Sequence, residues 1–256
     1  GTVCEEHSER NADRDKERRD NNNPTPNKRS NHQMFGTPVI VTMSSGGIIE
    51  DALPRWSPIM RTIDFWYEFA STYSYVSAMR ITQAAAKAGV AVRWRPFLLG
   101  PIFKELGWND SPFNIYAAKG QYMWRDLARV CDDEGLPLAL PPVRFPQNGL
   151  KAARLAIVGV MAGWTPDFTL GVFMANYAEQ RDIADDETLR DILEQCSVDP
   201  DPAFEAATSP ANKEALFAQT ADAKARGIFG APSFTVGEEL FWGNDRLEAA
   251  IAWAKA

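Results

Sequence analysis

Residues 62–96 combine an aromatic strand pattern, a corner of small residues, a helical run and a second strand pattern. The segment at 62–69, TIDFWYEF, alternates and is rich in aromatic side chains, as is typical of a buried strand. The run at 75–88 has helical spacing and ends at Gly89, a residue that favours a helix C-terminus. A second short strand is predicted at 91–96. Because these elements follow one another so closely, we expect a β-α-β unit with parallel strands.

The chain after this unit is predicted to be helical until near its end. Further helices are expected at 115–134, 151–162, 167–180, 186–195 and 212–226. The last part returns to strands at 232–236 and 239–241, followed by a closing helix at 244–256. Since the first and last strands must share one small sheet, the helical block, at about 101–226, is expected to be an insertion. The sequence thus predicts one α/β domain over residues 61–256.

The first 59 residues differ in composition from the rest. Residues 1–34 are highly charged, contain an Asn run and carry almost no apolar side chains. Such a segment cannot bury enough surface to offset the entropy of ordering, and it lacks the apolar core of a secretory signal. Residues 35–59 hold one short apolar stretch, VIVTM, which suits a strand. We expect residues 1–59 to be a poorly ordered extension, and Met60 is an alternative start site.

Composition excludes several classes of function. A net charge of −7 argues against a nucleic-acid partner, and no apolar run approaches the ~20 residues of a membrane span. The three cysteines, Cys4, Cys131 and Cys196, form no CxxC pair, which favours a reducing cytoplasm. The two histidines, His7 and His32, both lie in the N-terminal segment. The body of the chain therefore lacks the imidazole of a Ser-His-Asp or Cys-His mechanism, and we predict no metal site.

The corner between the first strand and the first helix carries Ser71 and Ser74. A serine at such a corner is most often an N-cap, whose oxygen accepts a free backbone N–H. The same corner lies at the positive end of the helix dipole, where a thiolate is stabilised and its pKa falls. Both interpretations remain open from the sequence.

Pro232 directly precedes a predicted strand, so the Ala231–Pro232 bond is a candidate cis peptide. In that case the backbone of Ala231 faces outward and can pair with an extended ligand. The alternative is an ordinary turn before an edge strand.

The segment WGNDR opens the last predicted helix. Gly243 permits close approach of the backbone. Asn244 and Asp245 offer free N–H groups for a carboxylate and a carboxylate for an amine, which suits the zwitterionic end of an amino acid. Simple helix capping explains the same residues.

The segment GWNDSPFNIYAAKGQYMWRDL contains two candidate polar contacts, Asn109 and Lys119. Its aromatic residues Trp108, Tyr122 and Trp124 line either a hydrophobic pocket or the core. Aromatic residues at helical spacing belong to a core more often than to a ligand site.

Five ordered segments resemble one family: DFWYEFASTYSYV, RWRPFLLG, KGQYMWRDL, FGAP and FWGNDRL. They are similar to segments of the 2-hydroxychromene-2-carboxylate isomerases, which group with the kappa-class glutathione transferases and the disulfide oxidase DsbA. The resemblance covers residues 62–255. It implies a thioredoxin-like fold with a helical insertion, bound glutathione, a small aromatic substrate from aromatic-compound catabolism, and a homodimer.

The resemblance also implies roles for individual residues. Ser71 matches the family's catalytic serine, which donates a hydrogen bond to the sulfur of glutathione. Ala231, before Pro232, matches the residue whose backbone pairs with the cysteine of glutathione. Asn244 and Asp245 match the residues that hold its γ-glutamyl end.

Further contacts are expected from the segment that follows the second strand. Asn109 and Lys119 match additional glutathione contacts. Lys104 is a candidate for the carboxylate of the substrate, and Trp108 and Tyr122 are candidates for its apolar part.

The corner departs from the family at one position. Members usually carry a proline after the first serine, and here the residue is Thr72. The change frees φ in the first helical turn and adds a hydroxyl and an N–H donor.

The activity that the resemblance implies is glutathione-dependent cis-trans isomerisation. Because the cofactor supplies the nucleophile, the protein needs no histidine. A kappa-like transferase or peroxidase and a non-catalytic thioredoxin-like binding module are the alternatives. Disulfide exchange needs two thiols, and both corner positions are serines.

Overall fold

The computed structural model describes residues 61–140, 142 and 144–255; the expectations about residues 1–59 lie outside this range. Four strands form one sheet: β1 (Thr62–Tyr67), β2 (Ala91–Pro96), β3 (Ser233–Val236) and β4 (Glu239–Trp242). The helices before β3 are α1 (Thr72–Ala88), α2 (Leu99–Glu105), α3 (Pro112–Ile115), α4 (Ala117–Asp133), α5 (Leu150–Ala162), α6 (Thr165–Tyr177), α7 (Asp186–Gln195), α8 (Pro200–Thr208) and α9 (Pro210–Ala225). After β4 follow the 3₁₀ turn η1 (Asn244–Arg246) and α10 (Leu247–Lys255).

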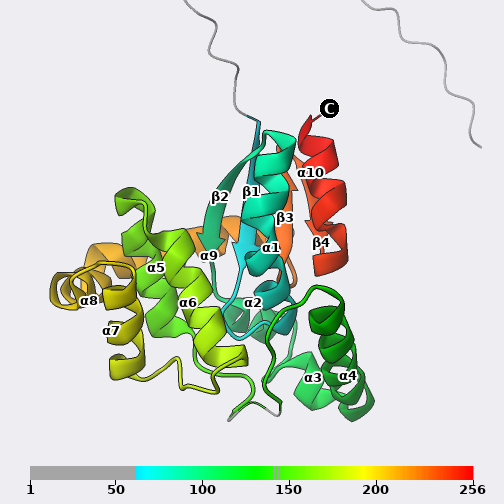
Figure 1. Cartoon of the computed structure of the whole chain (residues 1–256), viewed down its shortest axis with the longest axis horizontal. Coiled ribbons are helices and arrows are strands. Elements are labelled where there is room, and N and C mark those ends of the chain that lie inside the picture. The colour runs from blue at the N-terminus through cyan, green and yellow to red at the C-terminus, as the bar shows by residue number, and fades with distance from the viewer. Residues whose placement is uncertain (1–60, 141, 143, 256) are drawn as a thin grey trace, which may run out of the picture. The chain divides into compact units, whose positions relative to one another are not determined.

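The sheet has the strand order β2-β1-β3-β4. β1 and β2 are parallel, as predicted, and β3 and β4 are added antiparallel. One face packs against α1 and α10, while α5 to α8 gather beside β2 (Figure 1). On this face Phe65 stacks on Tyr67 and Phe234, with ring centroids 5.1 and 5.5 Å apart. This aromatic packing holds the two ends of the chain in one core.

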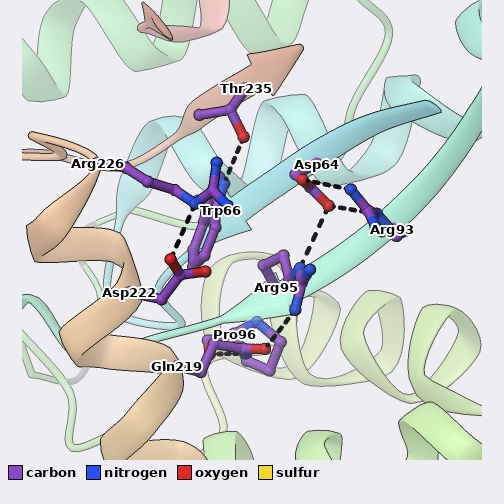
Figure 2. Close-up of polar contacts among 9 residues, drawn as sticks. All are labelled: Asp64, Trp66, Arg93, Arg95, Pro96, Gln219, Asp222, Arg226 and Thr235. Carbon is purple, nitrogen blue, oxygen red and sulfur yellow. Dashed lines mark hydrogen bonds and ion pairs between the residues drawn. The ribbon is translucent and has the colours of Figure 1, made fainter. Parts of the chain in front are cut away.

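The opposite face of the sheet carries a set of polar contacts, and Gln219 links it to α9 (Figure 2). The Trp66 indole donates a hydrogen bond of 3.0 Å to the Thr235 hydroxyl. Gln219 of α9 donates to the carbonyl of Pro96 at the end of β2. Beside them, the buried carboxylate of Asp64 forms ion pairs with Arg93 and Arg95 of β2, with N–O distances of 2.7 and 3.2 Å. Both ion pairs join neighbouring strands across the sheet.

The corner begins earlier than predicted, because β1 ends at Tyr67. The Tyr67 carbonyl still accepts the N–H of Phe97, but the next carbonyl, that of Glu68, accepts the N–H of Ser71 and turns the chain. α1 then starts at Thr72 rather than at 75.

Two other predicted helices are modified. The helix predicted at 115–134 starts at Ala117 as α4, after the short helix α3, and the two pack closely because Gly120 has no side chain. A Cβ at Gly120 would lie 2.2 Å from the carbonyl oxygen of Phe113. The last helix starts only at Leu247, after η1.

Helices α2, α3 and α8 have no counterpart among the predicted elements. α8 carries clear start signals, because the side chain of Asp199 accepts the N–H of Asp201 and Pro200 occupies the first helical position. α2 has no side-chain cap at its N-terminus. None of the helices in the described ranges is both long and apolar enough to cross a membrane.

Candidate active site

The hydroxyl of Ser71 connects the corner after β1 to the segment just before β3. Its hydroxyl oxygen accepts the N–H of Ser74 at 3.3 Å, so it is the N-cap of α1. The same hydroxyl donates a hydrogen bond of 2.9 Å to the carbonyl of Ala231, 160 residues away. The Ala231–Pro232 bond is cis. The structure therefore brings together the serine corner and the Ala231–Pro232 bond, which the sequence marked separately. Ser71 is both the N-cap of α1 and the candidate site residue.

The Ala231 carbonyl is already paired with Ser71 instead of being free for a ligand. A ligand that takes the place of this contact releases the Ser71 hydroxyl, which can then donate to the ligand. The positive end of the α1 dipole lies at the same point and favours an anion there.

Two side chains of α6 hold the corner in place. The buried hydroxyl of Tyr177 donates to the Ala70 carbonyl at 2.7 Å, and the Asn176 amide donates to the Phe69 carbonyl at 3.0 Å. Gln147 in turn donates to the Asn176 oxygen at 2.9 Å. No local sequence pattern marks these contacts, because an Asn or Tyr within a helix does not show which distant carbonyl it meets.

A carboxyl group lies inside the corner. One oxygen of the half-buried Glu68 accepts the N–H of Ala70 at 3.0 Å. Burial raises the pKa of Glu68 to about 7, although the Ala70 hydrogen bond opposes this shift. A substantial fraction of this carboxyl is therefore protonated at neutral pH, three residues before Ser71. It was not among the predicted site residues.

The first turn of α1 is tied to α4 through Asp126. Tyr73 donates to this carboxylate at 2.8 Å and Tyr122 at 3.3 Å. Burial raises the pKa of Tyr73, and the Asp126 hydrogen bond and charge raise it further. Tyr122, a predicted substrate contact, is 62% exposed, so most of its ring faces solvent.

Asn244 and Asp245 have different surroundings. The side-chain oxygen of Asn244 accepts hydrogen bonds from Ser77 at 3.0 Å and from Arg80 at 3.3 Å, so it tethers η1 to α1. Asp245 is exposed and, among the residues that the structure describes, forms an ion pair with its neighbour Arg246 alone, at 3.0 Å. Of the two side chains, the carboxylate of Asp245 is the one open to a ligand, whereas the amide oxygen of Asn244 is already engaged.

Trp108 follows α2 and packs against Phe103 of that helix. Its ring lies 5.4 Å from that of Phe103, and Phe103 packs on the same small apolar cluster as Ala231. Trp124 instead packs against Phe145, with ring centroids 4.8 Å apart.

The other three predicted contacts lie on the surface. Lys104 and Asn109 are exposed, and the ammonium of Lys119 lies 5.5 Å from the centre of the Phe113 ring. Nothing in the described contacts joins them to Ser71 or Ala231. Within the same part of the chain, no group of three His, Cys, Asp or Glu side chains is arranged to hold a metal ion.

Comparison with known proteins assigns the chain to a family. The model of the DSBA-like thioredoxin domain matches residues 62–251. A 2-hydroxychromene-2-carboxylate isomerase of Sphingobium xenophagum is 30% identical over 189 residues, which cover 73% of this chain and 95% of the relative. Glutathione S-transferase kappa 1 of Caenorhabditis elegans is 34% identical over 88 residues, 34% of this chain and 38% of the relative.

A solved structure agrees with the sequence matches. The structure of a 2-hydroxychromene-2-carboxylate isomerase superimposes with a TM-score of 0.67 at 26% identity, covering 75% of this chain and 95% of the other. The predicted thioredoxin-like α/β fold is thereby confirmed. The chain belongs to the DSBA-like thioredoxin-domain family and, within it, to the 2-hydroxychromene-2-carboxylate isomerases.

Proposed function

We propose that this protein is a glutathione-dependent cis-trans isomerase that interconverts 2-hydroxychromene-2-carboxylate and trans-o-hydroxybenzylidenepyruvate, or a related aromatic compound. The observation that carries the proposal is the hydroxyl of Ser71, held at the N-terminus of α1 within 2.9 Å of the Ala231 carbonyl. A peptide thiol that pairs with the backbone of Ala231 places its sulfur beside this hydroxyl and the helix terminus.

The residues of the corner fit the demands of glutathione. Ser71 is a hydrogen-bond donor that can be turned from Ala231 to a sulfur, and the α1 N-terminus lowers the pKa of a thiol. Asp245 offers an exposed carboxylate for an amino group. Ala231 and Pro232 form the backbone edge, and Asn244 holds η1 against α1.

When bound, glutathione supplies the thiolate nucleophile that adds reversibly to the conjugated C=C bond and so permits rotation. Ser71 would hold this sulfur at the N-terminus of α1 by a hydrogen bond from its hydroxyl and so favour the thiolate form. Trp108 and Tyr122 provide aromatic surface for the substrate, with Lys104 as the cation for its carboxylate. Asn109 and Lys119 are proposed as outer contacts to glutathione.

The direct test is to follow turnover of 2-hydroxychromene-2-carboxylate with and without glutathione. We expect isomerisation only in the presence of glutathione. Unchanged turnover on omitting glutathione from thoroughly dialysed protein refutes the proposal.

A transferase is the second candidate, and the match to a kappa-class glutathione transferase favours it. The same corner would then activate glutathione for conjugation to an electrophile or for peroxide reduction. Accumulation of a glutathione adduct with chlorodinitrobenzene, without isomerase turnover, identifies this activity. A folded protein that shows no calorimetric binding of glutathione is instead a non-catalytic binding module.

We further propose that the protein acts in the cytoplasm as a homodimer. A free glutathione thiol requires a reducing compartment, which is consistent with the absence of a CxxC pair. Light scattering of the purified full chain tests the dimer.

A further inference from the structure

A cavity lies between α2, α5 and α9 and is lined by no residue of the candidate active site. Its volume is about 300 Å³, which is at the small end of the range for ligand sites. Much of its wall is apolar and includes Leu98, Ile102, Leu216 and Phe217. Phe217 is 74% exposed and leaves an aromatic ring at the surface.

Arg154 of α5 gives this cavity a charged group without a partner. Its Nε atom is buried and has no hydrogen-bond acceptor in the described part of the chain. No ion pair of its guanidinium is formed there either. Arg154 as a whole is partly exposed and lines the cavity, so an anion bound there can accept from its guanidinium N–H groups and supply the charged partner that the described residues do not.

The charge of the lining points to an anion. Lys213 and Lys224 also line the cavity, and the one acidic residue of the lining, Glu105, is paired with Lys224. Arg154 and Lys213 are therefore left as an excess of positive charge, in a chain whose net charge is −7. A planar guanidinium matches a carboxylate, and the apolar wall matches a ring rather than an inorganic ion.

We propose that this cavity is a binding site for a small carboxylate whose apolar body is about one ring in size. The carboxylate pairs with Arg154, and the ring lies against the apolar wall. The site is separate from the glutathione corner and does not depend on the proposed isomerase activity.

Calorimetric titration of the full chain with trans-cinnamate tests this site, with cinnamyl alcohol as the neutral analogue. We expect saturable binding of cinnamate and at least tenfold weaker binding of the alcohol, since the alcohol offers no charged acceptor to the guanidinium of Arg154. Arg154→Met should weaken cinnamate binding by about tenfold or more, and Arg154→Lys by less. Ala221→Phe, which fills the cavity from its lining without removing a charge, should weaken it as well.

Two matched variants separate this site from others. Arg125→Met removes an exposed arginine outside the cavity, and Ser71→Ala alters the corner; both should bind cinnamate as the wild type does. If Arg154→Met does not fold, the Ala221→Phe variant decides. The proposal is overturned if the wild type shows no saturable binding of cinnamate, or if inorganic phosphate or cinnamyl alcohol binds as tightly as cinnamate. It is also overturned if Ala221→Phe or a folded Arg154→Met binds cinnamate as the wild type does, or if Ser71→Ala abolishes this binding.

Discussion

The hydroxyl of Ser71 donates to the carbonyl of Ala231 across 160 residues of sequence, and this contact joins the first and last parts of the sheet at the site. The same hydroxyl caps α1. One oxygen atom thus links the stability of the corner to the position at which a thiol would be activated.

Ser71→Ala should lower both stability and turnover. Loss of the cap costs about 1 kcal/mol of unfolding free energy, and loss of a donor to a developing anion lowers kcat/KM by about 10²-fold. The pKa of bound glutathione, followed by the ultraviolet absorbance of its thiolate, should rise. Ser74→Ala is the matched control, because the buried Ser74 hydroxyl has no partner among the residues that the structure describes. Wild-type turnover and thiol pKa in Ser71→Ala would contradict this role.

Thr72→Pro should stabilise the protein by about 0.5–1 kcal/mol. Thr72 is the first residue of α1, where proline is favoured, and Ser71 has φ −82° and ψ 117°, a conformation that a following proline accepts. The gain arises from reduced entropy of the unfolded chain. Ser74→Pro is the contrasting variant, because it deletes the N–H that Ser71 caps. Urea unfolding measures the stability of both variants relative to the wild type. A Thr72→Pro variant that is less stable than the wild type would show that Thr72 itself stabilises the corner.

Tyr177→Phe should loosen the corner from a distance. It leaves the buried carbonyl of Ala70 without its donor, at a cost of about 1–3 kcal/mol in unfolding free energy. The KM for glutathione should rise, because the segment before Ser71 loses a support. Tyr116→Phe removes an exposed hydroxyl that forms no hydrogen bond within the described ranges, and it should change neither quantity. Equal effects of the two substitutions would exclude the support that we assign to Tyr177.

Glu68 should make the protein less stable as the pH rises. Its carboxyl has a pKa of about 7 in the folded protein against 4.5 when unperturbed, so its contribution is complete below 4.5 and is lost as the pH passes through 7. With a discount for partial exposure, the loss is on the order of 2 kcal/mol. Glu68→Gln should remove this part of the pH dependence, whereas Glu238→Gln, at an exposed turn, should not. Urea unfolding at pH 5 and pH 8 measures it, and parallel profiles for wild type and Glu68→Gln would refute the assignment.

Much of the fold follows from local sequence patterns. The alternation in β1, Gly89 at the end of α1 and the β3–β4 hairpin are all properties of short segments, and they were predicted close to their observed positions. The boundaries shifted where a tertiary contact decides them. β1 ends at Tyr67 because the carbonyl of Glu68 turns back to the N–H of Ser71.

The sequence allowed individual residues of the site to be predicted, but not the contacts between them. Ser71 and Ala231 were each marked by a local pattern and by family resemblance, but their contact depends on sheet topology. The hydrogen bonds from α6, and the Arg154 Nε that has no acceptor among the described residues, depend on how helices pack, which helical periodicity does not specify. Asn244 was marked as a ligand contact, and only the structure shows that its oxygen is already bonded to Ser77 and Arg80.

The most direct test of the central claim compares glutathione with S-methylglutathione in the isomerase assay. Both retain the peptide backbone and the γ-glutamyl end, but the methylated compound cannot form a thiolate. We predict full isomerase turnover with glutathione, none with S-methylglutathione, and competitive inhibition by the latter. Equal turnover with the two compounds would contradict a mechanism in which Ser71 holds a nucleophilic sulfur.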